Sequence, residues 1–423
     1  MTALGPIAGV RRTRYHDDDG NLDVYPLDSK INLLIIGGTR SRYTQVFSHN
    51  AARLYAELTE ADAAEMLNNL LCVDIDKASL SDVAQAVSTS CRSPFDRETS
   101  EDADAAVQCA VDVSEPDRDG EGVGGDGEKF LSKRLDELLK KPDRDTVIQD
   151  AIDGKLEGAE AAPSSPVAKT VVYAMADGTG VPGLKKELSE NGKGDGGAKT
   201  FEAKIGSVFR QGFSAEGLPM LYGGDIARLP DTTKYTGTVG KIDQFDPQFA
   251  EFTERHGVHS DDQIVFIGDG ALWIWNMQRK LFPNAICVID FFHAAEHLNG
   301  IVDALTIFAI GKRKEFREKC HHLLELGEID QLVSLIRGKM RKHNEKQIEK
   351  RLAYFTENAD KMRYGLFKAA GMFVGSGVIE AACKTIVGKR MKNAGMHWSK
   401  KNAEGVIALR CAIYSGEFDS QAA

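Results

Sequence analysis

The sequence predicts an α/β protein with a mixed β-sheet core and an all-helical insertion, preceded by a mainly helical N-terminal domain. Three observations support this fold class. Residues 170–290 alternate between β-rich runs and helical periods, residues 293–370 are strongly helical and basic, and residues 51–87 repeat apolar side chains at helical spacing. A chain of 423 residues with 42% hydrophobic content is long enough to bury more than one core.

The predicted core, residues 166–292, has its elements in a definite order. They are strands at 170–176, 200–211 and 235–239, a helix at 247–256 ended by Gly257, a strand at 263–268, a helix at 271–281 and a strand at 285–290. Three strands, a helix, a strand, a helix and a strand match the start of an RNase H-like fold.

The rest of the chain divides by composition. We expect an N-terminal helical domain (1–95), an acidic flexible linker (96–165), the first part of the core (166–292), a helical insertion (293–370), the C-terminal helices of the core (371–415) and a disordered tail (416–423). The linker is too polar to bury enough apolar surface to offset the cost of ordering, although 130–141 is predicted to form a helix within it.

The N-terminal domain admits two interpretations. A helical stretch, a break at 74–76 and a further helix at 80–87, capped by Ser79 or Ser81, fit a helix-turn-helix that contacts DNA. A small helical bundle used for dimerisation fits the same pattern.

Charge and cysteine usage restrict the location and the partners. The net charge of −10 is unevenly distributed: 271–423 carries 24 Lys and Arg against 16 Asp and Glu, and much of the acid lies in 96–128. Overall acidity therefore does not exclude nucleic acid. The seven cysteines form no CxxC pair, and no apolar run approaches the roughly 18 residues of a membrane span. We expect a cytoplasmic, nucleoid-associated protein with reduced thiols and no membrane segment.

Three carboxylates are the candidate catalytic residues. Asp177 and Asp269 are each predicted to end a strand, within an Asp-Gly pair, and these two strands are expected to be neighbours. Glu380 lies in an otherwise apolar helical stretch, where a buried carboxylate needs a partner. Such oxygen ligands suit two Mg²⁺ ions, or Mn²⁺, acting on a phosphodiester. The alternatives are that each Asp-Gly is a turn and that Glu380 pairs with Lys384.

Several blocks of sequence around these acids resemble bacterial insertion-sequence transposases of the ISKra type. They are 173–180 (YAMADGTG), 268–276 (GDGALWIWN), 289–298 (IDFFHAAEHL) and 375–385 (GSGVIEAACKT), followed by 395–399 (GMHWS). These blocks keep the order of the family and cover about 166–415.

The resemblance implies an RNase H-like catalytic domain with a DDE triad of Asp177, Asp269 and Glu380, which binds Mg²⁺. It also implies a helical insertion ahead of the Glu-bearing helix, and cleavage and strand transfer at insertion-sequence ends. Double-stranded DNA would be the partner, and joining two ends requires a homo-oligomer. The chain departs from many relatives in having no Cys in residues 1–60, where they carry a Cys-rich zinc-binding element.

Asp290 and His293 are auxiliary candidates. Asp290-Phe291-Phe292-His293 resembles the Asp-x-x-His motif of Mutator-like transposases, so Asp290 would lie near the metal site and His293 would contact DNA or orient a ligand. The alternative is that Asp290 only caps the following helix. His297 with Cys320, His321 and His322 does not have a convincing zinc-ligand spacing.

DNA contacts are predicted from basic and aromatic residues near the acids. They are Lys384, Lys389, Arg390, Lys392, Trp398 and Trp273. The alternatives are a solvated basic helix face and aromatic packing of a helix on the sheet. The formal GxGxxG at 178–183 lacks the helix and the acid that dinucleotide binding needs.

Three functions therefore compete. A DDE transposase is favoured over a metal-dependent nuclease without strand transfer and over a domesticated, catalytically inactive DNA-binding protein.

Overall fold

The computed structural model describes most of the chain. The described residues are 45–71, 75–91, 129–155, 160–161, 167–190, 199–222, 225–259, 262–305 and 310–418, together with the short strands β1 (Tyr15–His16), β2 (Asp23–Val24), β3 (Leu33–Ile36) and β4 (Thr39–Thr44).

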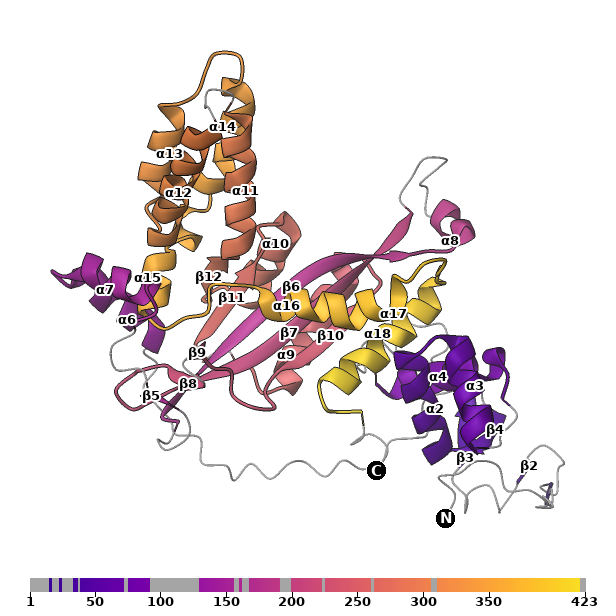
Figure 1. Ribbon diagram of the computed structural model, residues 1–423. Helices are drawn as coiled ribbons and strands as arrows, with labels where there is room; N and C mark the ends of the chain where they lie inside the picture. Colours follow the sequence, from indigo (N-terminus) through magenta and orange to yellow (C-terminus); the bar gives the residue numbers. More distant parts are fainter. Residues whose placement is uncertain are drawn as a thin grey trace.

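A five-stranded mixed sheet lies at the centre of the molecule (Figure 1). Its strands are β6 (Lys169–Pro182), β7 (Thr200–Phe213), β10 (Lys234–Thr238), β11 (Ile264–Gly268) and β12 (Ile286–Ile289). In the spatial order β10-β7-β6-β11-β12, β7 is antiparallel to both neighbours, whereas β6, β11 and β12 are parallel. The order of elements predicted for 166–292 is confirmed, and its first and fourth strands are indeed neighbours.

Helices cover both faces of the sheet. One face carries α9 (Ile242–Arg255) and α10 (Leu272–Leu281); the other carries α16 (Gly377–Ala382), the π-helical turn η3 (Cys383–Gly388), α17 (Lys389–Met391) and α18 (Lys400–Tyr414). Glycines allow this close packing. A Cβ at Gly206 would meet Phe249 of α9 at 2.5 Å, and one at Gly237 would meet Ile407 of α18 at 3.0 Å.

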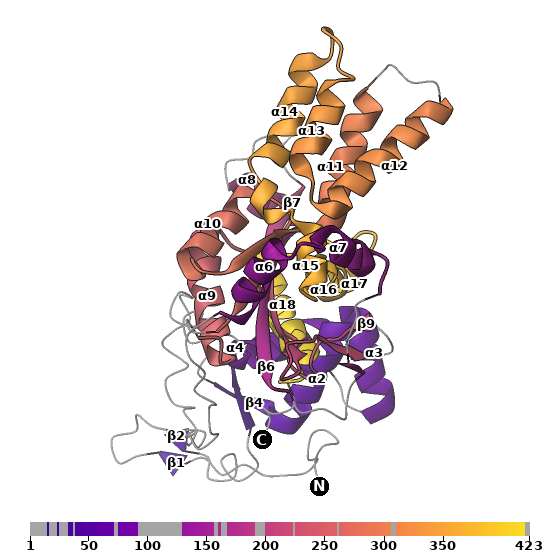
Figure 2. The same cartoon turned by 90° about the vertical axis from the view of Figure 1, so that its left-hand side faces the viewer.

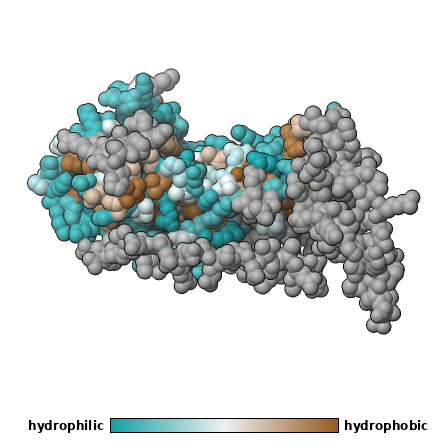
Figure 3. Space-filling view, turned by 90° about the horizontal axis from the view of Figure 1, so that it is seen from below, coloured by the Kyte–Doolittle hydropathy of each residue, from teal (hydrophilic) through white to brown (hydrophobic). Residues whose placement is uncertain are grey.

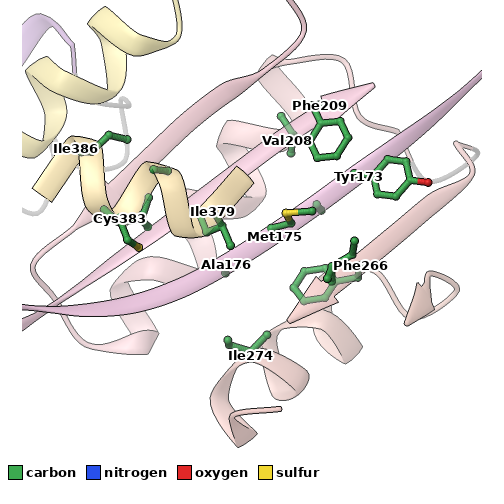
Figure 4. Packing of buried hydrophobic residues seen from close by; sticks show 14 of the residues in the cluster. Tyr173, Met175, Ala176, Val208, Phe209, Phe266, Ile274, Ile379, Cys383 and Ile386 are labelled. Carbon is green, nitrogen blue, oxygen red and sulfur yellow. The ribbon is translucent and has the colours of Figure 1, made fainter. Parts of the chain in front are cut away.

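The central strands are buried, as expected for strands covered by helices. Figure 4 shows Ile379 and Cys383 directed toward β6 on the face that carries Met175. All three are at most 7% exposed, so helix α16 is seated directly on the strand that carries Asp177. The view of Figure 3 shows a mainly hydrophilic described surface with small hydrophobic groups. No helix in the described part of the chain is long and apolar enough to cross a bilayer.

A helical insertion follows β12 and projects from one end of the sheet (Figure 2). It consists of α11 (Phe291–Ala304), α12 (Ile310–Leu326), α13 (Ile329–Arg337), α14 (Glu345–Thr356), the 3₁₀ turn η2 (Ala359–Lys361) and α15 (Tyr364–Ala369). The strongly helical character predicted for 293–370 is confirmed.

The N-terminal helices pack against the C-terminal helices of the core. They are α2 (Gln45–Glu57), α3 (Glu60–Leu71) and α4 (Lys77–Ser90). The predicted cap of the last helix is wrong: α4 begins earlier because the Asp76 side chain accepts from Ser79 N at 2.7 Å. Buried Arg410 of α18 donates to Ala56 O and joins the two regions.

Two predicted irregular segments are partly ordered. Residues 130–152 of the expected linker form α6 (Phe130–Lys140) and α7 (Arg144–Ile152), whose Leu131 and Ile148 are buried. Residues 92–128 lie outside the described residues.

The tail prediction is wrong at 416–418 because Phe418 is 2% exposed and stacks on His49, with 3.7 Å between ring centroids. The remaining described elements are β5 (Glu160–Ala161), α8 (Lys185–Glu190), β8 (Met220–Tyr222) and β9 (Asp225–Ile226).

Candidate active site

Asp177 lies where strand β6 loses one of its two neighbours. The parallel pairing with β11 is recorded as far as Met175↔Ile267, whereas the antiparallel pairing with β7 continues to Pro182↔Thr200. The prediction that Asp177 ends its strand is therefore wrong, and so is a turn at Asp177-Gly178. Asp177 instead sits within a strand whose β11 side is open.

Asp269 directly follows the last residue of β11, at the same edge of the sheet. Since Met175 pairs with Ile267 in the parallel ladder, continuing that register by two residues brings Asp269 level with Asp177. Asp269 is followed by a turn, because Gly270 has a φ of +100° and its Cα faces Tyr354, which a Cβ would meet at 2.7 Å. The Asp269 side chain accepts from Ala271 N at 2.8 Å, and its carbonyl accepts from the Tyr354 hydroxyl at 3.1 Å.

Glu380 reaches this edge from helix α16. The segment before α16 is tied to the sheet by three bonds: Phe373 N to the Tyr173 hydroxyl, Phe291 N to Val374 O, and Ser376 N to the Asp290 carboxylate. The Glu380 side chain is 44% exposed; one oxygen accepts from Ser376 Oγ at 3.2 Å and the other lies 3.5 Å from Lys384 Nζ. The alternative pairing with Lys384 is thus present, but an exposed i,i+4 pair contributes only a few tenths of a kcal/mol.

The other two carboxylates act electrostatically on Asp177. Burial is the main cause that raises the pKa of Asp177, and the charges of Asp269 and Glu380 raise it further. The Gly178 amide and the Cys383 thiol, which hydrogen-bond to Asp177, act in the opposite direction. The acids therefore share one electrostatic environment, drawn from β6, β11 and α16.

The donor chemistry of these acids fits a hard divalent cation. Within the described residues, no three His, Cys, Asp or Glu side chains already stand close enough together to hold a metal ion. A bound cation would nevertheless offset the negative charges of Asp269 and Glu380 that raise the pKa of Asp177, and carboxylate oxygens are the ligands that Mg²⁺ prefers. One oxygen of Asp177 and one of Asp269 is held by a following backbone amide, which limits how each side chain can turn.

Asp290 and His293 lie at the start of α11, directly after β12 at the same edge. Asp290 is 1% exposed; one carboxylate oxygen accepts from His293 N at 2.6 Å and the other from Ser376 N. It therefore caps α11, as the alternative interpretation held, and also anchors the segment that leads to Glu380. The His293 ring lies 5.3 Å from His297, which in turn stacks on Tyr354 at 4.2 Å.

The predicted DNA-contact residues separate into surface and buried groups. Lys384, Lys389 and Lys392 are exposed, and Lys392 Nζ donates to Thr179 Oγ1 at 2.6 Å beside Asp177. Arg390 and Trp398 are only 2% and 6% exposed, which contradicts a DNA contact for either in this conformation.

Packing explains the burial of these last two residues. Arg390 donates to Tyr55 O at 3.1 Å, and its guanidinium lies over the Trp398 ring at 4.7 Å. Trp273 is half-buried and packs edge-on against Phe245 with a centroid distance of 6.2 Å, whereas Trp275 is buried. Aromatic packing, the alternative interpretation, therefore accounts for both tryptophans.

Sequence reasoning missed Tyr354, Phe292 and Leu272. Tyr354 contacts Asp269 from a helix 85 positions away, and nothing local to either residue signals that pairing. Phe292 and Leu272 are large apolar residues, yet they are 69% and 71% exposed.

Comparison with known proteins adds no relative. No protein-family model matches the chain, and no curated protein is significantly similar to it. Any functional conclusion therefore rests on the residues of the site.

Proposed function

We propose that the chain is a DDE transposase with an RNase H-like catalytic core that cleaves and joins DNA at insertion-sequence ends. One observation carries the proposal. Asp177 and Asp269 stand at the same edge of adjacent parallel strands, and Glu380 lies on helix α16, which packs on β6, and its charge acts on Asp177.

Two further features support it. The spatial order β10-β7-β6-β11-β12, in which β7 runs opposite to the other four strands, is the arrangement expected of an RNase H-like sheet. A helical insertion separates β12 from α16, as the resemblance to ISKra-type transposases implies. The resemblance is a separate argument, because it rests on blocks of sequence and not on the geometry.

Asp177, Asp269 and Glu380 would hold two Mg²⁺ ions. When bound, such ions lower the pKa of the attacking hydroxyl and stabilise charge on the leaving oxygen. The residues of the chain supply the positions: β6 and β11 fix the two aspartates, and the Asp290 and Tyr173 contacts fix the segment before Glu380. Exposed Lys384 and Lys392 provide positive charge beside the acids for a DNA phosphate.

The test is metal-dependent cleavage of a duplex that carries the end of the element encoding this chain. Asp177→Asn, Asp269→Asn and Glu380→Gln should each lower the cleavage rate by at least about a hundredfold, since each removes a ligand charge. Exposed acids of α9 supply matched controls. Asp243→Asn and Glu254→Gln should cut like the wild type.

The products separate the transposase from a nuclease. A transposase joins the cleaved end to target DNA in the same reaction, whereas a nuclease leaves only free ends. If one triad variant cuts at the wild-type rate, that residue is not part of the catalytic site. If the wild type cuts and never joins, strand transfer is excluded.

A further inference from the structure

Phe292 and Leu272 are unusual among the apolar side chains of the described residues. They are 69% and 71% exposed, whereas the next most exposed large apolar residues, Val167 and Leu184, are each 41% exposed. An aromatic ring left in water forgoes hydrophobic stabilisation of about 25 cal/mol per Å² of apolar surface. Phe292 and Leu272 both follow proposed site acids in the sequence, so we expect a bound ligand to cover such exposed apolar surface.

Both residues lie just after strands that end at the edge of the sheet that carries the acids. Leu272 follows Asp269 by three positions and Phe292 follows Asp290 by two. The two loops are held together, because β11 and β12 pair as far as Gly268↔Ile289 and Asp290 N donates to Gly268 O at 2.8 Å.

The Phe292 ring also approaches the segment that leads to Glu380. A Cβ at Gly375 would lie 3.5 Å from the ring and 3.8 Å from the Asp290 carboxylate. Since Ser376 is bonded both to Asp290 and to Glu380, the exposed ring is placed between the β12 loop and the Glu380 helix.

We propose that Phe292 stacks on an unpaired or flipped nucleobase next to the phosphate that is cut. The inference rests on the proposed function and adds a nucleotide-binding residue to it. A base offers an uncharged planar face, which suits an aromatic ring beside Asp269 and Asp290 better than a phosphate does.

The distribution of charge agrees with a base at this place. Lys384 and Lys392 lie near Glu380 and Asp177, on the π-helical turn and after α17, and Lys392 contacts Thr179 of β6. A third cation, Lys368, lies over the Phe291 ring, which is 5.7 Å from the Phe292 ring. The exposed neighbours of Phe292 along α11, Glu296 and His297, are polar, so the ring does not continue into an apolar stripe on that helix. A DNA phosphate would lie beside Lys384 and Lys392, and the base would lie on the Phe292 ring.

The experiment measures binding of the full-length protein to fluorescently labelled DNA, with Ca²⁺ in place of Mg²⁺ so that binding is read without cleavage. The probes are a single-stranded oligonucleotide and a set of element-end duplexes, each with one abasic site near the cut. Phe292→Ala and Phe292→Leu should weaken binding by roughly tenfold, whereas Phe292→Trp should stay within about twofold of the wild type. Leu139→Ala, which shortens a 40%-exposed leucine of α6, is the matched control and should bind normally.

The abasic duplexes identify the base. At one position, removing the base should make the wild type and Phe292→Ala bind equally, because the stacking partner is gone. Binding by Phe292→Ala within twofold of the wild type, or an equal loss at every abasic position, overturns the inference. A loss of self-association by Phe292→Ala in sedimentation, without a position-specific base effect, would make the ring a contact between copies and also overturn it.

Cleavage by the wild type separates this inference from the proposed function. If the protein does not cut in Mg²⁺ but the Phe292 dependence of binding holds, base stacking stands and the transposase assignment fails. If the protein cuts and binding ignores Phe292, the transposase assignment stands and base stacking fails. Absence of any DNA binding overturns both.

Discussion

The two helical regions added to the sheet are joined to it by different chemistry. The N-terminal helices are held by buried guanidinium groups: Arg410 donates to Ala56 O, Ile386 O and Thr385 O and lies 3.0 Å from Glu57. With the Tyr414 hydroxyl, five acceptors surround this 1%-exposed arginine and form a connection that is costly to break.

The insertion meets the Asp269 loop through aromatic rings instead. Tyr354 of α14 donates to Asp269 O, packs on Gly270 and stacks on His297 of α11. These are neutral contacts, and they end on a proposed catalytic residue. The comparison therefore indicates that the N-terminal connection mainly stabilises the fold, whereas the Tyr354 contact mainly positions the site.

The largest expected effect is on stability, at Arg410. Arg410→Ala leaves three buried carbonyls and Glu57 without their donor, so the free energy of unfolding should fall by about 3–5 kcal/mol in urea titrations. Arg337→Ala in the insertion is the matched control. It removes a bidentate pair with Glu349 that is half exposed, and the unfolding midpoint should barely move. Equal losses in the two variants would contradict the contrast between the regions.

A smaller effect, and one mainly on activity, is expected at Tyr354. Tyr354→Phe keeps the ring against Gly270 but removes the donor to Asp269 O, which should cost about 1 kcal/mol of stability. If Tyr354 positions Asp269, the cleavage rate should fall roughly tenfold and the Mg²⁺ concentration for half-maximal cleavage should rise. A purely structural role would leave the Mg²⁺ dependence unchanged.

Tyr364→Phe is the control for this change. Tyr364 of α15 is fully buried, and its hydroxyl has no hydrogen-bond partner in the described part of the chain. Removing it should leave the Mg²⁺ dependence as it is and should not lower the stability, because a buried hydroxyl without a partner costs stability.

The contrast between these regions also separates what the sequence could predict from what it could not. The strands were predictable because hydrophobic periodicity is a local property. Their neighbourhood, and with it the common edge of Asp177 and Asp269, followed from matching the order of elements along the chain to an RNase H-like sheet. The continuation of β6 beyond Asp177 was hidden by Gly178, which resembles a turn signal but lies in a strand paired with β7. Local sequence shows pairing only poorly when the partner strand lies beyond a connecting segment.

The sequence also failed to predict which polar and aromatic residues are buried in long-range contacts. Arg390 and Trp398 have the composition of a DNA-binding surface, yet Arg390 donates to Tyr55, which is 335 positions away. Tyr354 and Asp269 meet in the same way across the insertion. Such contacts depend on which helices pack together, and no spacing within one segment reports that.

The smallest expected effect is a pH dependence confined to the insertion. Burial is the first cause that lowers the pKa of His297, and nearby His293 lowers it further, while Glu296 and Asp269 act in the opposite direction. Because the folded pKa lies below the unfolded value of about 6.5, the folded form binds fewer protons, so this contribution to stability is complete above pH 6.5 and is lost as the pH falls. His297→Phe keeps a ring against Tyr354 but does not titrate. The stability of His297→Phe relative to the wild type should therefore rise as the pH is lowered from 7.5 to 5.5. Urea unfolding at the two pH values would measure this change. Arginine side chains stay protonated over this range, so the cost of Arg410→Ala should be the same at both pH values. A pH-dependent Arg410→Ala together with a pH-independent His297→Phe would reverse the assignment of neutral contacts to the insertion and charged contacts to the N-terminal helices.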